Sequence, residues 1–508
     1  MVNHFYNGTI RKYIVLFGRM FNDIDIVRKN KNSTKIQTLR VPIAYGPKEK
    51  WLTRLNQDAG LNRPVSIQLP RLSFEVTAMN YDSTRTLNKM HKYSSINDET
   101  NRLTSQYTPV PYNINVSLYG MFANNEDAVQ VVEQIIPFFR PYLSREDKKQ
   151  IMISLNSSTL TDGPKLREFE RSFAKFTGAK FAIAVSNATS ALHLSIKSLG
   201  IGKGDEVIVP DMTFVATANA VMLSGATPVF ADVEKDSMNI SIKSIEKMIT
   251  NKTKAIIPVH FAGRACKMKE IVKLSKKNHL KIVEDCAHAI GAKIEGKHVG
   301  NFSSAGCFSF YPTKNITTIE GGMIITNSKD IAKNVTSLRN HGLTKTLMQR
   351  YSKGKPWDYD IIQPGYNYRL DEIRATLGIS QLNRIKKINL LRKKVYEYYN
   401  KKFESIEGII TPKSSKKEDH AYHLYILKVN HKSKVNRNEL FKKLGKVGIQ
   451  TTVHYKPLHK FTPFKKIKKD KLKNSEELYE EIISLPFYPN ISIKDQDIVI
   501  NNIIKIVK

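Results

Sequence analysis

Short apolar runs alternate with amphipathic segments along the chain from about Lys180 onward. The apolar runs include FAIAV, EVIVP, TPVFA, KAIIPV and LKIVE, and segments such as TSALHLSIKSLG and KEIVKLSKKN separate them. Apolar runs of this length are typical of strands buried on both faces, and the segments between them have helical spacing. The pattern predicts an α/β domain whose parallel sheet is covered by helices, with ligands bound where strands end and helices begin.

Residues 1–140 show a different pattern. Runs such as RLSFEVTAMNY and YNINVSLYGMF alternate apolar and polar positions, and turn-rich stretches such as STRTLNKMHKYSSINDETN lie between them. Alternation with a period of two favours antiparallel strands with one solvated face. We therefore predict a separate α+β module, with a helix-like segment that begins at Glu126 and ends near Pro137.

The chain beyond Ile385 begins with a lysine-rich helix, LLRKKVYEYYNKKF, and continues with mixed elements such as HAYHLYILKV. This pattern predicts a smaller α+β domain at the C-terminus. The expected organisation is an N-terminal module over residues 1–136, a large domain over residues 137–385 and a small domain over residues 386–508. A chain of 508 residues is long enough for these units.

Composition excludes several classes of protein. Lys and Arg number 81 against 46 Asp and Glu, but this excess is spread along the chain, which favours a solvated surface over a nucleic-acid site. The three cysteines, Cys266, Cys286 and Cys307, have neither metal-type spacing nor a disulfide framework. No run of about 18 apolar residues is present to span a membrane. We expect a cytoplasmic protein without a metal, a specific nucleic-acid partner or a membrane anchor.

Four stretches carry candidate chemistry: SNATSALHL (186–194), DMTFVATANA (211–220), VEDCAHAIGA (283–292) and FSFYPTKNITTIEGGMI (308–324). Lys314 follows the apolar run CFSFYP. Taken alone it is a surface lysine, but a lysine sheltered beside a sheet can have a depressed pKa and attack an aldehyde cofactor. Asp285 follows the run LKIVE and is either a helix N-cap or a buried carboxylate that needs a cationic partner.

Other positions in these stretches allow two interpretations each. Thr189 and Ser190 open a helix, where they cap it, bind an anion such as phosphate, or do both. Ser309 is either a buried serine or a further phosphate ligand. Phe214 is either a core residue or a ring that stacks on a flat cofactor. His288 is either a satisfied core histidine or a cofactor contact.

In this order and spacing, the four stretches resemble the DegT/DnrJ-type nucleotide-sugar aminotransferase family from about Pro137 to the C-terminus. The resemblance implies the aspartate aminotransferase fold, known as fold type I, with pyridoxal 5′-phosphate as cofactor. It implies that Lys314 forms a Schiff base with the cofactor and later moves a proton between the substrate carbon and the cofactor. Asp285 then pairs with the pyridine nitrogen and strengthens the electron sink. A related sugar dehydratase branch has histidine in place of this lysine, so Lys314 argues against it.

The same resemblance assigns roles to the remaining candidates. Thr189, Ser190 and Ser309 contact the cofactor phosphate. Phe214 stacks on the pyridine ring, and His288 lies near the phenolic oxygen of the cofactor.

Two later segments extend the resemblance. GYNYRLDEIRA (365–375) matches a family segment that crosses the dimer interface, which implies a homodimer in which Asn367 reaches the phosphate in the partner subunit. HYKPLHKF (454–461) resembles the HY-x-P-x-H segment of the sugar pocket and implies His454 and Tyr455 as substrate-binding residues. Ile319 departs from the glycine that the family usually has there.

The segment from about residue 3 to residue 140 carries a second resemblance. HFYNGTIRKYIVLFGRMFNDIDIVRK, LPRLSFEVTAMNYD and SQYTPVPYNINVSLYGMF look like the tail sheath stabiliser of T-even-like bacteriophages, an assembly protein of the tail and neck. We expect an enzyme that transfers an amino group from an amino acid to a nucleotide-linked keto sugar, with glutamate as the expected donor. The alternative is a phage tail or neck assembly protein, located in the virion tail, that carries an appended transferase-like domain.

Overall fold

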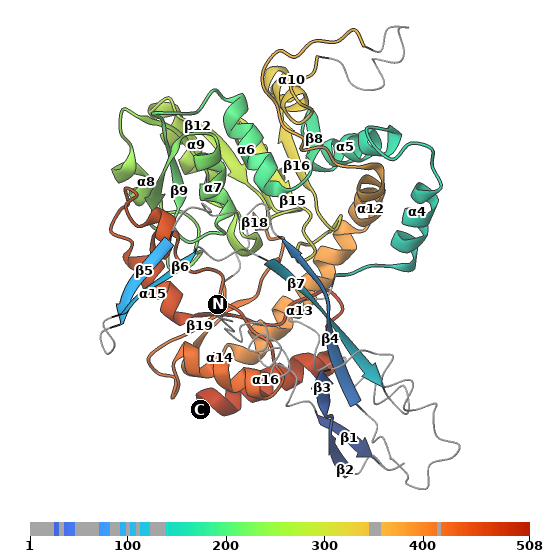
Figure 1. Ribbon diagram of the computed structural model, residues 1–508. Helices are drawn as coiled ribbons and strands as arrows, with labels where there is room; N and C mark the ends of the chain where they lie inside the picture. The colour runs from blue at the N-terminus through green and yellow to red at the C-terminus, as the bar shows by residue number, and fades with distance from the viewer. Residues whose placement is uncertain are drawn as a thin grey trace. The chain divides into compact units, whose positions relative to one another are not determined.

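The computed structural model describes residues 25–29, 35–45, 71–81, 92–97, 102–107, 112–121, 139, 141–344, 357–413 and 418–508. The chain divides into two compact units, Met1–Ile136 and Pro137–Lys508, and each is described by itself (Figure 1). Within the described residues, no helix combines the length and the apolar character that crossing a membrane requires.

In its described residues, the N-terminal unit consists of paired strands. These are β1 (Asp25–Lys29), β2 (Lys35–Arg40), β3 (Ile43–Tyr45), β4 (Arg71–Tyr81), β5 (Lys92–Asn97), β6 (Arg102–Tyr107) and β7 (Tyr112–Met121). The pairs β1–β2, β5–β6 and β4–β7 are antiparallel, and β3 runs parallel to β4. The prediction of antiparallel strands is confirmed, but β5 lies within the stretch STRTLNKMHKYSSINDETN, for which the prediction of turns was wrong. Phe74 of β4 is buried and its ring meets that of Tyr45 edge-on at 5.5 Å. The helix predicted from Glu126 lies outside the described residues.

A seven-stranded sheet forms the centre of the second unit. Its strands are β8 (Phe181–Val185), β9 (Glu206–Pro210), β10 (Thr227–Ala231), β11 (Thr253–Ile256), β12 (Lys281–Asp285), β15 (Ala305–Ser309) and β16 (Gly322–Thr326). The order is β10-β9-β11-β12-β15-β16-β8. The predicted parallel sheet is confirmed except for β16, which returns after a loop and pairs antiparallel with both β15 and β8.

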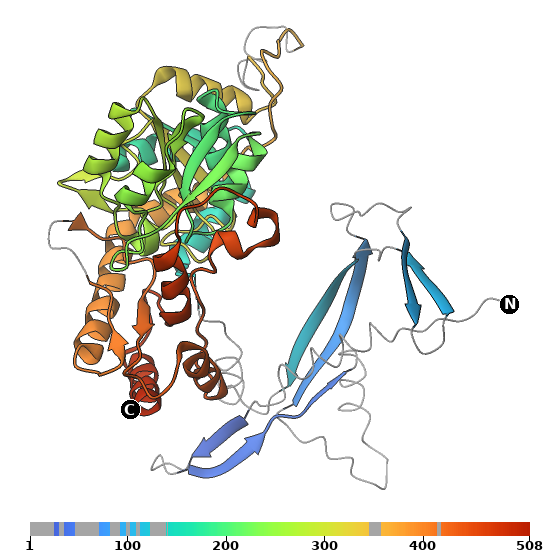
Figure 2. The same cartoon turned by 90° about the vertical axis from the view of Figure 1, so that its left-hand side faces the viewer.

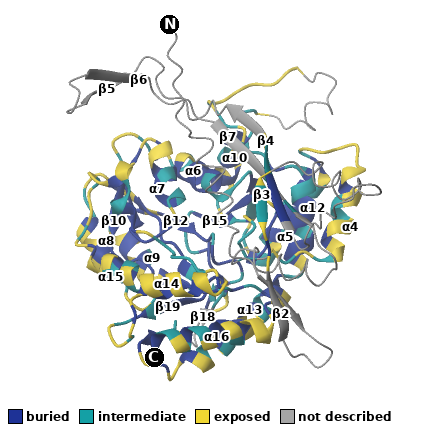
Figure 3. Cartoon of the chain, turned by 60° about the horizontal axis from the view of Figure 1, so that its bottom comes forward, coloured by how far each residue is buried: buried dark blue, intermediate teal, exposed yellow. Residues whose placement is uncertain are grey.

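Helices cover both faces of this sheet (Figures 1 and 3). They are α4 (Arg145–Leu155), α5 (Pro164–Thr177), α6 (Ala188–Ser198), α7 (Ala216–Leu223), α8 (Ile242–Met248), α9 (Met268–Lys277), α10 (Lys329–Leu338) and α12 (Glu372–Asn383). One core packs α5, α8, α9 and α12 against the sheet, and the other packs α6, α7 and α10. Because side chains alternate along a strand, Ile282 and Val283 of β12 belong to opposite cores.

Helix α4 is fixed to α12 by one fully buried carboxylate. Asp147 accepts hydrogen bonds from Ser380 Oγ at 2.6 Å and Gln381 Nε2 at 2.9 Å, and it pairs with Arg384. Ser144 and Asp147 also form a capping box at the start of α4. The chain from residue 141 onward is therefore integrated into the second unit.

The C-terminal elements form a third, smaller core (Figure 2). They are α13 (Ile385–Phe403), β17 (Ile409–Ile410), β19 (Ile426–Val429), α14 (Arg437–Lys446), β20 (Ile482–Ser484) and α16 (Ile493–Val507), and α15 (Lys473–Glu481) packs through Leu478 in a separate small cluster. Strand β19 lies between β17 and β20 and pairs antiparallel with both. A further small sheet joins β13 (Lys293–Ile294) to β14 (Lys297–His298) and β18 (Glu418–Asp419). The α/β fold class with a smaller C-terminal α+β part is thus confirmed.

Candidate active site

Lys314 lies in the loop that joins β15 to β16. A turn bond from the Lys314 amide to the Tyr311 carbonyl (2.9 Å) and a bond from the Thr318 amide to the Phe310 carbonyl (2.9 Å) fold this loop back over the sheet edge. The Lys314 ammonium makes no hydrogen bond or ion pair with any described residue. Burial lowers the pKa of Lys314 to about 8, although Asp285 acts in the opposite direction. A sizeable neutral fraction near neutral pH makes this amine a nucleophile.

Asp285 ends β12 and is 5% exposed. Its carboxylate accepts hydrogen bonds from Thr217 Oγ1 at 2.9 Å and from the Ala287 amide at 3.1 Å. Burial raises the pKa of Asp285, against the lowering effects of these two bonds and of the Lys314 charge. A carboxylate in this setting favours a cationic hydrogen-bond donor as partner, because burial without one is costly.

The start of α6 forms a polar cup at the sheet edge. Asn187 is the N-cap, and its Oδ1 accepts hydrogen bonds from the Ser190 amide (2.8 Å) and from Ser190 Oγ (3.0 Å). Thr189 is half-buried in the first turn, and its hydroxyl donates to no described residue. A Cβ on Gly322 would lie 2.4 Å from the Asn187 carbonyl oxygen, so only glycine lets β16 start this close to the cup. Helix N-termini of this kind bind phosphate.

The rings of Phe214, Tyr455 and His288 pack in a row. Phe214, although apolar, is 56% exposed, and its ring centroid lies 5.9 Å from that of Tyr455. His288 is buried, its Nδ1 accepts from the Ala262 amide (3.3 Å), and its Nε2 lies 3.1 Å from Tyr455 Oη. Burial and the Lys314 charge hold the pKa of His288 well below its usual value. The neutral ring therefore carries its proton on Nε2 and donates it to Tyr455, which leaves the tyrosine O–H free to donate to a ligand.

The remaining candidate residues, Ser309, His454 and Asn367, lie on three different segments of the chain. Ser309 ends β15, and its Oγ accepts from the Tyr311 amide at 3.4 Å. His454 bonds Ser484 Oγ through Nδ1 at 2.8 Å, and burial followed by the Lys314 charge lowers its pKa to about 4. The Asn367 side chain is exposed and makes no hydrogen bond with a described residue of the cup in its own chain.

The structure thus brings Lys314, Asp285, His288, His454 and Tyr455 into one electrostatically coupled group. Sequence reasoning missed two members of this site. Thr217 supports Asp285, and His423 lies against His288 with ring centroids 4.3 Å apart. A polar residue on the apolar helix ATANAVML was a signal for Thr217, whereas nothing local marked His423.

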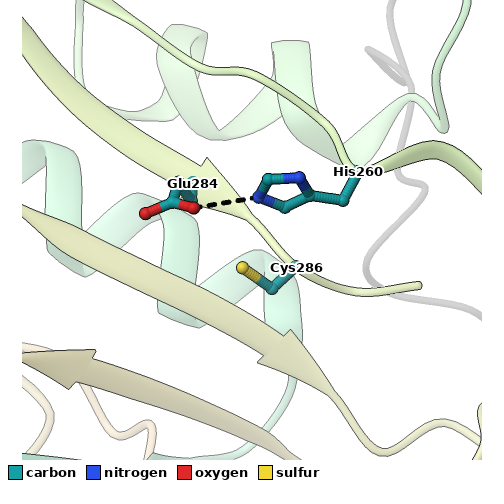
Figure 4. Close-up of side chains that lie close together, drawn as sticks. All are labelled: His260, Glu284 and Cys286. Carbon is teal, nitrogen blue, oxygen red and sulfur yellow. Dashed lines mark hydrogen bonds and ion pairs between the residues drawn. The ribbon is translucent and has the colours of Figure 1, made fainter. Parts of the chain in front are cut away.

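A second buried cluster lies next to this site. His260, Glu284 and Cys286 bring their potential ligand atoms within 4.8 Å of one another (Figure 4). Glu284 already accepts from His260 Nε2 (3.0 Å), the amides of Gly300 (2.8 Å) and Phe302 (2.9 Å), and Ser303 Oγ (2.7 Å). The His260 Nδ1 accepts from the Cys266 amide at 3.0 Å. These bonds engage both ring nitrogens of His260 and both carboxylate oxygens of Glu284, and they tie the loop at Gly300–Ser303 to β12.

Family comparisons agree with this geometry. Residues 141–504 match the model of the DegT/DnrJ/EryC1/StrS aminotransferase family. Residues 4–165 match the T4-like virus Myoviridae tail sheath stabiliser, so this match extends beyond the predicted limit of residue 140. The two matches overlap over residues 141–165, the segment that α4 anchors in the second unit.

Two curated relatives and two solved structures cover the same part of the chain. The uncharacterised protein MJ1066 of Methanocaldococcus jannaschii is 42% identical over 74% of this chain and 98% of its own length. The spore coat polysaccharide biosynthesis protein SpsC of Bacillus subtilis is 38% identical over 75% and 99%. Spr1654 from Streptococcus pneumoniae, in its PMP form, has a TM-score of 0.69 at 31% identity and covers 73% and 99%. Helicobacter pylori PseC, an aminotransferase involved in pseudoaminic acid biosynthesis, has a TM-score of 0.68 at 32% identity and covers 73% and 98%.

Proposed function

Because the chain belongs to the DegT/DnrJ/EryC1/StrS aminotransferase family, we propose that it transfers an amino group from an amino acid to a nucleotide-linked keto sugar, with glutamate as the donor. Pyridoxal 5′-phosphate is its cofactor. The observation that carries the proposal is the presence of two groups in one site: a lysine amine with a pKa of about 8, which bonds no described residue, and a buried carboxylate at the end of β12. The names of SpsC and PseC support a sugar as the acceptor.

The residues present fit this cofactor. Lys314 has a free amine for its aldehyde, Asp285 can accept a hydrogen bond from a pyridinium N–H, and the exposed Phe214 ring offers a stacking face. The cup of Thr189 and Ser190 at the start of α6 suits its phosphate. When bound, the cofactor supplies an electron sink for the pair left at the amine-bearing carbon.

The chain's own groups would divide the work in the following way. The Lys314 amine, carried by its loop over the sheet edge, would move a proton between the substrate carbon and the cofactor within each half-reaction, away from the carbon of the donor in the first and onto the carbon of the acceptor in the second. Asp285 would keep the ring nitrogen protonated, because the negative charge of the carboxylate stabilises the cationic form of the ring. The Tyr455 hydroxyl, oriented by His288, donates to an oxygen of the ligand, and His454 lines the sugar side.

A spectrum of the purified protein tests the proposal. We expect a visible absorption band that disappears on addition of glutamate and returns when the right member of a panel of UDP- and dTDP-linked keto sugars is added. The first change reports the donor half-reaction and the second the acceptor half-reaction. Loss of the band with glutamate but no recovery with any sugar would contradict the sugar acceptor and leave the transaminase chemistry intact.

A composite site in a homodimer is part of the proposal, since Asn367 is exposed and its side chain makes no hydrogen bond with the described cup residues of its own chain. We expect Lys314→Ala and Asn367→Ala to be inactive separately. Mixing them under subunit exchange should restore about a quarter of the wild-type sites, because half of the dimers are mixed and each mixed dimer has one intact site. Absence of recovery in exchanged dimers would show that Asn367 serves its own chain.

The match of residues 4–165 favours a second candidate function for the N-terminal unit, namely binding to phage tail or neck proteins. Cosedimentation of the full chain with purified tails of a T4-like phage tests it, with a chain that begins at residue 137 as the control. Equal sedimentation of both chains would contradict a binding role for residues 1–136.

A further inference from the structure

His459 lies between two carboxylates. Its Nδ1 is 2.8 Å from Asp211 Oδ2, and its Nε2 is 3.2 Å from Glu476 Oε1. The Asp211 side chain is fully buried and that of His459 is 10% exposed, whereas that of Glu476 is 56% exposed. The His459 amide also donates to Asp211 Oδ1 at 3.0 Å. Both ring nitrogens and the backbone of this residue are thus engaged with acidic groups.

The protonation state of His459 follows from the chemistry of its partners. An ionised carboxylate only accepts hydrogen bonds, so each ring nitrogen of His459 must carry a proton to bond its partner. The ring is therefore an imidazolium when both contacts are made. Its hydrogen bond with Asp211 raises the pKa of His459, as do the charges of Asp211 and Glu476, whereas burial and the charge of Lys469 act against them.

This contact joins two segments of the active site that are far apart in sequence. Asp211 precedes Phe214 by three residues in the loop after β9, and His459 follows Tyr455 by four residues. The Leu458 amide adds a bond of 2.8 Å to the Asp211 carbonyl, and Leu458 is fully buried. The rings of Phe214 and Tyr455 lie next to each other where the two segments meet.

We propose that His459, in its doubly protonated form, is a positioning residue that holds the Tyr455 segment against the Phe214 loop and so maintains the binding site for the sugar substrate. The inference rests on the proposed aminotransferase function. Loss of one proton breaks the contact with one carboxylate and loosens the segment. We expect the effect to fall on substrate binding, because among the described residues the His459 side chain bonds only Asp211 and Glu476, neither of which is assigned to the cofactor.

The direction of the pH effect follows from the raised pKa. The contacts are complete below the pKa of an unfolded histidine, about 6.5, and they weaken as the pH rises through the pKa of His459 in the folded protein. We therefore expect the KM for the sugar to rise on the alkaline side of that pKa, while kcat changes less.

Four variants of the full chain test the inference. In His459→Ala both ring contacts are lost, and we expect the KM for the reactive keto sugar to rise about tenfold, the effect of one charged hydrogen bond. In His459→Asn an amide nitrogen replaces Nδ1 and keeps the bond to Asp211 but not the bond to Glu476, so KM should equal the value that the wild type reaches at alkaline pH and should show no further rise with pH. Glu476→Gln should move this rise to lower pH. Glu480→Gln is the control: it removes the same charge from the same helix, but Glu480 does not bond His459. This variant should leave the pH of the KM rise unchanged.

NMR of histidine labelled with ¹³C and ¹⁵N provides a readout without turnover. We expect the His459 ring to titrate above 6.5, its pKa to fall in Glu476→Gln, and the His288 signals to shift in His459→Ala because the Tyr455 contact changes. A normal His459 pKa, or unchanged His288 signals together with an unchanged KM in His459→Ala, would overturn the inference. If no sugar reacts, the acceptor proposal fails while these titrations still decide the role of His459.

Discussion

The proposed active site has two sides that are built differently. On the cofactor side, Asp285, Ser309 and Ser190 lie at the ends or starts of buried elements, within a few residues of an apolar strand. On the substrate side, Tyr455 contacts His288, which lies 167 residues earlier in the sequence, and His459 contacts Asp211, which lies 248 residues earlier. The cofactor side is thus set by local strand–loop–helix geometry, whereas the substrate side exists only after the C-terminal domain has packed against the large domain.

The strongest test of the cofactor side is Lys314→Ala. We expect complete loss of turnover and of the adduct that borohydride reduction leaves on the protein, because no other described amine lies over Asp285. Lys276→Ala, which removes an exposed lysine from α9, is the control and should keep both. A reducible adduct that survives in Lys314→Ala would place the cofactor elsewhere.

The same lysine predicts a pH dependence. Since burial lowers the pKa of Lys314 to about 8, the neutral amine dominates above pH 8, and loading of cofactor-free protein should accelerate as the pH rises through that value. Stopped-flow absorbance after mixing with pyridoxal phosphate measures this rate. A midpoint near the ordinary lysine value of 10.5 would show that the amine is solvated.

Shortened chains test whether turnover and stability of the transferase unit depend on the N-terminal unit. A chain that begins at residue 137 retains Asp147 and its bonds to α12, so we expect wild-type turnover and an unchanged melting temperature for the transferase unit. A chain that begins at residue 166 lacks this buried carboxylate and leaves Arg384 unpaired, and it should be insoluble or inactive. If the chain from residue 137 fails while the full chain works, the two units form one functional unit.

Variants of two adjacent carboxylates are expected to differ in effect, one on turnover and the other on the stability of the fold. Asp285 and Glu284 follow each other in β12 and point to opposite faces of the sheet. Asp285→Asn should reduce turnover by orders of magnitude while cofactor still binds, because the charge at the ring nitrogen is lost. Glu284→Gln should instead destabilise the fold by about 3 kcal/mol, since it breaks a buried pair with His260. Urea unfolding and single-turnover assays with glutamate distinguish the two; near-normal turnover in Asp285→Asn would refute its role.

Local pattern predicted most strands and helices of the large domain, because their apolar runs are visible in the sequence, whereas the roles expected of Lys314 and Asp285 came from the resemblance to the aminotransferase family. The local pattern did not find β16 as a strand or its antiparallel direction, since strand direction depends on the path of the Lys314 loop. Thr217 and His423 escaped notice because their importance comes from contacts with Asp285 and His288. Phe214 also shows this limit: its spacing suits a core residue, yet the fold leaves it exposed beside Tyr455.

The smallest expected effect concerns Ile319, in the loop between Lys314 and β16. Its φ of 72° lies in the left-handed region, which explains why glycine is usual there, and 58% of the residue is exposed, so little apolar burial depends on it. Ile319→Gly should therefore raise the free energy of unfolding by about 1 kcal/mol, the cost of a left-handed side chain less the added entropy of glycine. Ile361→Gly, with a 56% exposed isoleucine outside that region, should lower it. Equal destabilisation by both, measured by urea unfolding, would show that Ile319 carries no strain; a gain in stability with slower turnover would show that the strain helps to hold Lys314 in place.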